Sequence, residues 1–154
     1  MYQVLIVDDE EIIKIGLRSI INWEQYGFNI VGTAENGQQA LDTAKKIRPD
    51  VIITDLYMPI MDGFELIERL KKNGLECEII VLSNYGDIEN VKKAIKMGAE
   101  DYILKVSYDQ KKFAVLLESL SEKLSRKKQV GKIKAQNEPK EEISLSQMKE
   151  YLLG

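Results

Sequence analysis

Five short apolar runs, separated by segments with helical periodicity, place the strongest constraint on what this chain can fold into. Each run is rich in Val, Ile, Leu or Phe and has the length of a strand buried on both faces. The runs lie at residues 4–7, 28–32, 50–55, 78–83 and 101–105. Apolar stripes with helical spacing follow at residues 12–21, 40–47, 64–70, 91–97 and 113–124. The alternation predicts an α/β fold in which a βα unit is repeated five times, with helices on both faces of a parallel sheet.

The composition supports a globular domain and excludes several kinds of site. Apolar residues make up 44% of the 154 residues, and the formal charge of −3 argues against a chain devoted mainly to coating nucleic acid. The chain has no histidine and only one cysteine, Cys77, which excludes an internal disulfide, histidine-based triads and zinc sites of these residues. No apolar run approaches the roughly 20 residues of a membrane span and no signal sequence begins the chain, so we expect a cytoplasmic protein without a membrane partner.

Polar residues collect at the carboxyl ends of the predicted strands. Asp8 and Asp9 follow the first strand, and Asp55 ends the third. Ser83 ends the fourth strand and Lys105 the fifth. In a doubly wound sheet these ends meet at one edge, near the point where the strand order reverses. The sequence therefore predicts that three carboxylates, a hydroxyl and an ammonium group converge there.

This set of groups suits phosphoryl transfer assisted by a metal ion. Carboxylates about 4 Å apart repel by about 4 kcal/mol at an effective dielectric constant near 20, and Mg²⁺ is a cation that prefers oxygen ligands. Asp55, at the end of the central strand, is the best candidate nucleophile toward phosphorus, with Lys105 and the Ser83 hydroxyl holding phosphoryl oxygens. The alternative for each aspartate is a structural cap: Asp8 or Asp9 on the next helix, and Asp55 on the turn that follows it.

The two glutamates that follow the acid pair have a simpler interpretation. Glu10 and Glu11 are expected in the first turn of the next helix, near the positive end of its dipole.

Four motifs resemble the receiver domain of two-component response regulators. They are IVDDE at 6–10, DLYMPIMDG at 55–63, LSNYGD at 82–87 and KKAIKMGAEDYILK at 92–105, and the resemblance covers about the first 120 residues. It implies a flavodoxin-like, doubly wound three-layer sandwich with sheet order 2-1-3-4-5. It also implies that Asp55 accepts a phosphoryl group from a histidine kinase, that Lys105 contacts this group and that Ser83 is the switch hydroxyl.

The same resemblance implies a metal site and a switch surface. Asp8 and Asp9 would form the acidic pocket, and Mg²⁺ would be held by Asp9, Asp55 and the backbone carbonyl of Tyr57, with Asp8 acting through water. Tyr102 lies where the family places its switch aromatic; the alternative is an ordinary half-buried strand aromatic. Phosphorylation would change the face made by the fourth helix, the fifth strand and the fifth helix, and would favour a homodimer.

A narrower resemblance concerns the partner domain. The stretch INWEQYGFNIVGTAENGQQAL at 21–41, with Trp23, is similar to receivers attached to arabinose-regulator-type (AraC-type) helix-turn-helix domains. We therefore expect a receiver at 1–121 that controls transcription through an output domain absent from this chain. Residues 122–154 are expected to hold the end of the last helix, a polar linker and, at 143–153, a short helix that begins the missing region. The basic stretch at 123–134 is expected to be solvated, with DNA contacted only through the output domain.

One position departs from the family pattern. The family's lysine is normally followed by a proline with a cis peptide bond, whereas Lys105 is followed by Val106. A cis bond before a residue other than proline costs about 2.5 to 4 kcal/mol, and the flexible stem of lysine can reach the site from a trans backbone. We expect a trans bond here, with the loop through Ser107 and Tyr108 displaced and more mobile.

Two other functions fit parts of the sequence less well. A phosphatase of the haloacid dehalogenase type needs a second acid two residues beyond its nucleophile, but Leu56 and Tyr57 follow Asp55. A flavin carrier on the same fold would bring its phosphate against Asp8, Asp9 and Glu10, which would repel it. The sequence therefore favours a signalling switch, not an enzyme.

Overall fold

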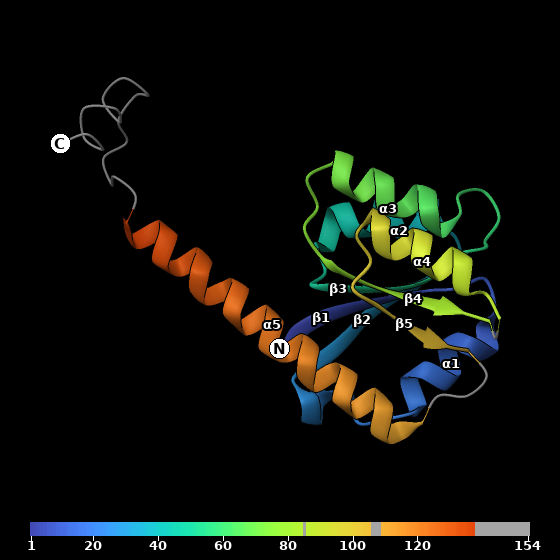
Figure 1. The fold of residues 1–154 in the computed structure, drawn as a ribbon, viewed down its shortest axis with the longest axis horizontal. Coiled ribbons are helices and arrows are strands. Elements are labelled where there is room, and N and C mark those ends of the chain that lie inside the picture. Colours follow the sequence, from blue (N-terminus) through green and yellow to red (C-terminus); the bar gives the residue numbers. More distant parts are fainter. Residues whose placement is uncertain (85, 106–108, 138–154) are drawn as a thin grey trace. The chain divides into compact units, whose positions relative to one another are not determined.

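The computed structural model describes residues 1–84, 86–105 and 109–137, with side chains up to residue 131 (Figure 1). Two expectations lie outside the described residues: the trans bond and displaced loop after Lys105, and the short helix at 143–153. Contacts divide the chain into two units, Met1–Ser121 and Glu122–Gly154. Within the described ranges, no helix has both the length and the apolar character needed to cross a bilayer.

The sheet has five parallel strands in the order β2-β1-β3-β4-β5, which confirms the predicted fold class and strand order. The strands are β1 (Tyr2–Val7), β2 (Phe28–Ala34), β3 (Val51–Asp55), β4 (Glu78–Ser83) and β5 (Asp101–Leu104). The helices are α1 (Glu11–Ser19), α2 (Gly37–Ile47), α3 (Gly63–Lys72), α4 (Ile88–Met97) and α5 (Gln110–Asn137). In Figure 1, α2, α3 and α4 cover one face of the sheet, and α1 and the first turns of α5 cover the other.

The central strands form the rigid middle of the fold. Every residue of β3 and β4 is buried, and so are the last four residues of β1. The sequences of these strands are therefore mostly apolar, as is usual when helices cover both faces of a sheet. The edge strand β5 is more exposed. The carboxyl ends of β1 and β3, which are neighbours in the sheet, are thus held in a fixed relation by the core.

The entry into β2 contains a short 3₁₀ helix, η1 (Trp23–Tyr26), that the apolar pattern did not predict. The Trp23 indole N–H donates to the Leu17 carbonyl at 3.0 Å, and its ring meets Phe113 edge-on with centroids 5.2 Å apart. Trp23 therefore contacts both the end of α1 and the start of α5, the two helices that cover this face of the sheet.

The predicted apolar stripe of α1 is wrong for two of its members. Ile12 and Ile15 are 75% and 55% exposed, and the residues of α1 that are buried are Lys14 and Leu17. The Lys14 ammonium group pairs with the Glu11 carboxylate at 3.1 Å while its stem is covered. Ile12 and Ile15 are three positions apart and share one face of α1, and this face is turned to solvent while the face with Lys14 and Leu17 is turned to the core.

The last helix is longer than the apolar stripe predicted. It continues past Leu124 to Asn137. The added segment contains no proline and is rich in Lys, Arg and Gln, which have good helix propensity, so the helix can continue without apolar residues facing a core.

Gly63, the first residue of α3, lies against the end of β3. Its N–H donates to the Leu56 carbonyl at 2.8 Å. A Cβ atom at this position would overlap the Asp55 carbonyl oxygen and approach the Leu56 Cα atom to 2.8 Å. The absence of a side chain thus allows α3 to begin beside the backbone that carries Asp55.

We expect Gly63→Ala to lower the free energy of unfolding by about 1 to 3 kcal/mol, because the new methyl group must push the backbone of residues 55 and 56 aside. Gly32→Ala is the control, since the nearest atom to its Cβ would be Leu5 Cδ1 at 3.6 Å, an ordinary contact. Its effect should stay within about 0.5 kcal/mol in urea denaturation. Equal losses in the two variants would contradict the role of the close approach.

Candidate functional site

The carboxyl edge of the sheet carries a compact group of acids. Asp8 directly follows β1 and is completely buried, and Asp55 is the last residue of β3. Val7 and Thr54, the residues just before them, are paired in the β1/β3 register, so the two aspartates emerge side by side. Asp9 completes the group: each of the three aspartates offers a carboxylate oxygen, and these oxygens lie within 4.8 Å of one another.

Lys105, which follows β5, reaches into this acidic group. Its Nζ atom lies 2.8 Å from Asp55 Oδ2 and 2.9 Å from Asp8 Oδ2. Its side chain is only 4% exposed. The Lys105 backbone N–H donates to the Ser83 carbonyl at 2.9 Å, which fixes the start of the side chain beside the end of β4. The ammonium group thus offsets the repulsion between two buried carboxylates.

Glu10 contributes a contact that the sequence did not indicate. Its carboxylate lies 3.4 Å from Lys105 Nζ, and its backbone N–H donates to Asp8 Oδ1 at 2.8 Å. Glu10 occupies the position just before α1, where its side chain makes no capping hydrogen bond to the described residues. The expectation that Glu10 belongs to the first turn was therefore wrong by one position, and the glutamate reaches the site because it lies outside the helix.

Both carboxylate oxygens of Asp55 accept hydrogen bonds. Oδ1 accepts hydrogen bonds from the backbone N–H groups of Leu56 at 2.7 Å and Tyr57 at 3.4 Å. Oδ2 accepts from Lys105. These contacts fix the orientation of the carboxylate at the end of the central strand, with only a small part of it open to solvent. A carboxylate held in one orientation is the arrangement that a nucleophile at this position would need.

The electrostatics of the site are set by burial and by Lys105. Burial raises the pKa of Asp8, and the hydrogen bond from Glu10 and the contact with Lys105 only partly oppose this effect. Burial alone would lower the pKa of Lys105, but Asp55 and Asp8 outweigh it and raise this pKa above the ordinary 10.5. The ammonium group is therefore charged at neutral pH.

The residues present fit a hard divalent cation. Although Asp8 Oδ2 is close to Lys105 Nζ, the contact is not aligned as a hydrogen bond, and this buried oxygen has no hydrogen-bond donor among the described residues. The three aspartates carry more negative charge than one ammonium group neutralises. Mg²⁺, with oxygen ligands that include water, would balance the remaining negative charge, and one of its waters could donate a hydrogen bond to this oxygen.

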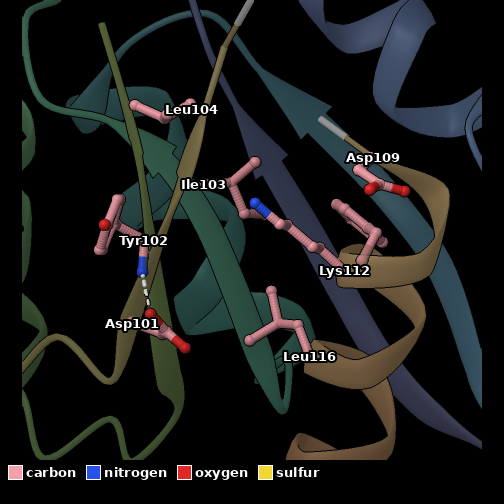
Figure 2. Close-up of a pocket in the computed structure, with 8 residues that line it drawn as sticks. Asp101, Tyr102, Ile103, Leu104, Asp109, Lys112 and Leu116 are labelled. Carbon is pink, nitrogen blue, oxygen red and sulfur yellow. Dashed lines mark hydrogen bonds between the residues drawn. The ribbon is translucent and has the colours of Figure 1, made fainter. Parts of the chain in front are cut away.

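The two predicted switch residues lie on neighbouring strands. Ser83 is buried at the end of β4, and Tyr102 is 41% exposed on the edge strand β5. A cavity of about 280 Å³ lies between β5 and α5, lined by Ile103, Lys112 and Leu116 among others. In Figure 2, Ile103 points toward α5; the alternation of a strand therefore turns Tyr102 to the other side. Tyr102 and Ile103 therefore lie on opposite faces of β5.

Comparisons with known proteins agree with this geometry. Residues 4–118 match the family model for the response regulator receiver domain. The transcriptional regulatory protein YesN of Bacillus subtilis is 39% identical over 122 residues, which are 79% of this chain and 33% of YesN. HptR, a transcriptional regulatory protein of Staphylococcus aureus, is 41% identical over 105 residues, 68% of this chain and 41% of HptR. The chain therefore spans less than half the length of these curated relatives.

Solved structures give the same result for the fold. The receiver domain of AraT, a response regulator from Geobacillus stearothermophilus, is 35% identical with a TM-score of 0.76, and the match covers 82% of this chain and 98% of that one. The two-component transcriptional regulator AraC from Clostridium phytofermentans is also 35% identical, with a TM-score of 0.72 and coverage of 82% and 97%.

The buried ammonium group should be essential to the stability of the metal-free protein. We expect Lys105→Met to lower the free energy of unfolding at neutral pH by about 3 to 5 kcal/mol, because Asp8 and Asp55 would keep their charges without a partner. Adding Asp55→Asn to this variant should restore part of the loss, and urea denaturation of the four combinations measures the coupling. Lys72→Met is the control, since Lys72 pairs with Glu68 at 3.6 Å on the surface. A loss no larger than that of Lys72→Met would contradict the charge balance described above.

Proposed function

The chain belongs to the response regulator receiver domains of two-component systems, and we propose that it works as a switch whose phosphoryl acceptor is Asp55. The observation that carries this assignment is the 2.8 Å contact between Lys105 Nζ and Asp55 Oδ2 beside Asp8 and Asp9. Asp55 ends the central strand and its two oxygens are oriented by Lys105 and by backbone N–H groups. Neither Asp8 nor Asp9 combines these features.

Receiver domains generally bind Mg²⁺ at an acidic pocket, and this chain has residues to hold it. Asp9, Asp55 and the Tyr57 backbone carbonyl would be its ligands, with Asp8 acting through water. When bound, the ion supplies positive charge that shields the carboxylates and binds a phosphoryl oxygen. The buried Asp8 Oδ2, which accepts no hydrogen bond from the described residues, and the close approach of the three aspartates support this assignment.

The proposed reaction is transfer of a phosphoryl group from a phosphohistidine of a sensor kinase. An Asp55 carboxylate oxygen attacks phosphorus, the P–N bond breaks, and the electron pair of that bond leaves with the imidazole of the kinase. Lys105, which neutralises Asp55 before the reaction, then donates to a phosphoryl oxygen, and the Ser83 hydroxyl donates to another. The product is an acyl phosphate on Asp55.

The surroundings of Asp55 favour a switch over an enzyme. Leu56 is fully buried and Tyr57 is the second residue beyond Asp55, so neither supplies the general acid that rapid turnover needs. The acyl phosphate would therefore persist long enough to act as a signal. The carboxylates of Asp8, Asp9 and Glu10 also oppose binding of a flavin phosphate at this edge.

The remaining parts of the proposal concern the division of the chain into two segments and the partners of each. We assign residues 1–121 to the receiver and 122–154 to the end of the last helix and the connection to an output region outside this chain. The two contact units support this division, and the longer relatives named as transcriptional regulators support control of transcription. Under this proposal the protein acts in the cytoplasm with a cognate histidine kinase and reaches DNA only through the output domain.

The proposed output face combines α4, β5 and the start of α5. Ser83 precedes the connection into α4, and the partly exposed Tyr102 lies on β5. A Ser83 hydroxyl drawn toward a phosphoryl group would free space for the Tyr102 ring, so the two residues could form an element with two arrangements. A face that becomes complementary to its own copy would then form a symmetric dimer.

Asp55 should be the sole phosphoryl acceptor. In the presence of acetyl phosphate and Mg²⁺, we expect the intact mass to increase by one phosphoryl group, and removal of Mg²⁺ to abolish the increase. Asp55→Asn should show no increase, because the nucleophilic oxygen is replaced by an amide nitrogen. Asp62→Asn is the control, since Asp62 caps α3 in the same loop and asparagine also caps helices. An undiminished increase in Asp55→Asn would refute the assignment.

Beryllofluoride, which mimics a phosphoryl group on aspartate, should shift the protein toward a dimer in sedimentation velocity. We expect Ser83→Ala to reduce this shift, because it removes the hydroxyl that couples Asp55 to α4 and β5. Ser19→Ala should behave as wild type, since the Ser19 hydroxyl donates to the Ile15 carbonyl on α1. If Ser83→Ala shifts as far as Ser19→Ala, the coupling does not pass through Ser83.

A further inference from the structure

Glu10 contacts the charged site without being the acceptor or one of the assigned metal ligands. Three carboxylates pair with the Lys105 ammonium group among the described residues. The side chains of Asp8 and Asp55 are 0% and 8% exposed, whereas that of Glu10 is 55% exposed. Glu10 therefore meets the ammonium group from the side that faces solvent, which is the side from which a phosphoryl donor arrives.

The direction of the Lys105 N–H bonds distinguishes these three partners. Nζ lies almost equally far from Asp55 Oδ2, at 2.8 Å, and from Asp8 Oδ2, at 2.9 Å. It donates a hydrogen bond to Asp55, whereas Asp8 Oδ2 accepts none from the described residues. The second aligned hydrogen bond of the ammonium group goes to Glu10 Oε1, at 3.4 Å. Distance alone therefore does not decide which of the two buried aspartates the ammonium group faces.

The contact with Glu10 supplies the missing constraint on the ammonium group. Its three N–H bonds have a fixed geometry, so two acceptors in different directions determine its rotation about the Cε–Nζ bond. Without Glu10, the group would be free to turn until an N–H bond was shared between Asp8 and Asp55, whose oxygens lie at nearly equal distances. The charge on the Glu10 carboxylate strengthens the bond that prevents this rotation.

The backbone of Glu10 is fixed on both sides. Its N–H donates to Asp8 Oδ1 at 2.8 Å, and its carbonyl accepts from the Lys14 N–H at 3.4 Å at the start of α1. The residue has extended backbone angles, with φ −95° and ψ 117°, and its side chain makes no capping hydrogen bond to the described residues. The carboxylate is thus placed beside Asp8 by the backbone and directed to Lys105.

We propose that Glu10 is a positioning residue that turns the Lys105 ammonium group toward Asp55 and away from Asp8. The inference rests on the proposed function of Asp55. An ammonium group held in this way stays beside the carboxylate that receives the phosphoryl group, aligned to donate to a phosphoryl oxygen. It also leaves Asp8 Oδ2 available to accept a hydrogen bond from a water molecule of the cation.

NMR of protein with isotopically labelled lysine tests the contact without metal or phosphoryl group. Glu10→Asp keeps the charge but shortens the side chain by one methylene group, so the carboxylate no longer reaches Nζ. We expect the Lys105 ammonium hydrogens to exchange with water about fivefold faster than in wild type, since one hydrogen bond is lost. Glu11→Asp is the matched control, because it makes the same change at the next residue, whose carboxylate pairs with Lys14. It should leave the exchange of Lys105 unchanged.

Phosphorylation by acetyl phosphate tests whether this orientation serves the reaction. At saturating Mg²⁺ we expect the maximal rate of the mass increase to fall about threefold in Glu10→Asp, because Lys105 is less well aligned with a phosphoryl oxygen. The Mg²⁺ concentration that gives half of this rate should stay within about twofold of wild type, since the charge near the aspartates is retained. Glu11→Asp should match wild type in both quantities.

Three results would overturn the proposal. Wild-type exchange of the Lys105 ammonium hydrogens in Glu10→Asp would mean that Glu10 does not hold the group. An unchanged maximal rate would mean that the orientation does not serve the reaction. Glu10→Gln keeps the length and an acceptor oxygen but loses the charge, so its exchange should rise less than that of Glu10→Asp. The reverse order would mean that the charge acts through its field and not through the contact.

The acceptor and the positioning residue can fail separately. The exchange measurement uses metal-free, unphosphorylated protein, so wild-type exchange in Glu10→Asp would refute the role of Glu10 and leave the assignment of Asp55 intact. Undiminished phosphorylation of Asp55→Asn would refute the acceptor instead, whatever the exchange of Lys105.

Discussion

Repulsion among three carboxylates, countered by one buried ammonium group, is the constraint on which the functional edge of this protein depends. Asp8 and Asp55 are brought together because β1 and β3 are neighbours whose carboxyl ends are in register. Without Lys105 the pair would be strongly unfavourable in a buried site. Lys105 stabilises this arrangement by pairing with both buried carboxylates, but one ammonium group does not neutralise three aspartates, and Asp8 Oδ2 accepts no hydrogen bond from the described residues.

The buried strands and the start of α3 hold the backbone of the charged residues in place. The buried strands β1, β3 and β4 leave little freedom for the backbone that carries the acids, and Gly63 lets α3 begin directly beside Asp55. Rigid support is what a reactive carboxylate requires, since small displacements alter the alignment with an incoming phosphorus atom. The edge strand β5, by contrast, is partly exposed.

The sequence predicted most of the sheet and most of the charged site, for a common reason. A strand buried on both faces is a continuous apolar run, and the first polar residue after it must lie at the sheet edge, so Asp8, Asp55 and Lys105 could be located from the runs alone. Contacts set by side-chain direction were not predictable in this way. Glu10 reaches Lys105 because it precedes α1, and the exposure of Ile12 depends on how α1 rotates against the sheet. The continuation of α5 to Asn137 likewise has no apolar signal.

The burial of the charged site also determines how it responds to dissolved salt. The pair between Arg69 and Glu65 on α3 is about half exposed, and at physiological ionic strength mobile ions screen such charges over roughly 8 Å. The side chains of Asp8 and Lys105 are 0% and 4% exposed, which leaves no room for a screening atmosphere between them. Changes in monovalent salt that weaken the surface pairs of α3 should therefore have much less effect on the contacts of Lys105 with Asp8 and Asp55.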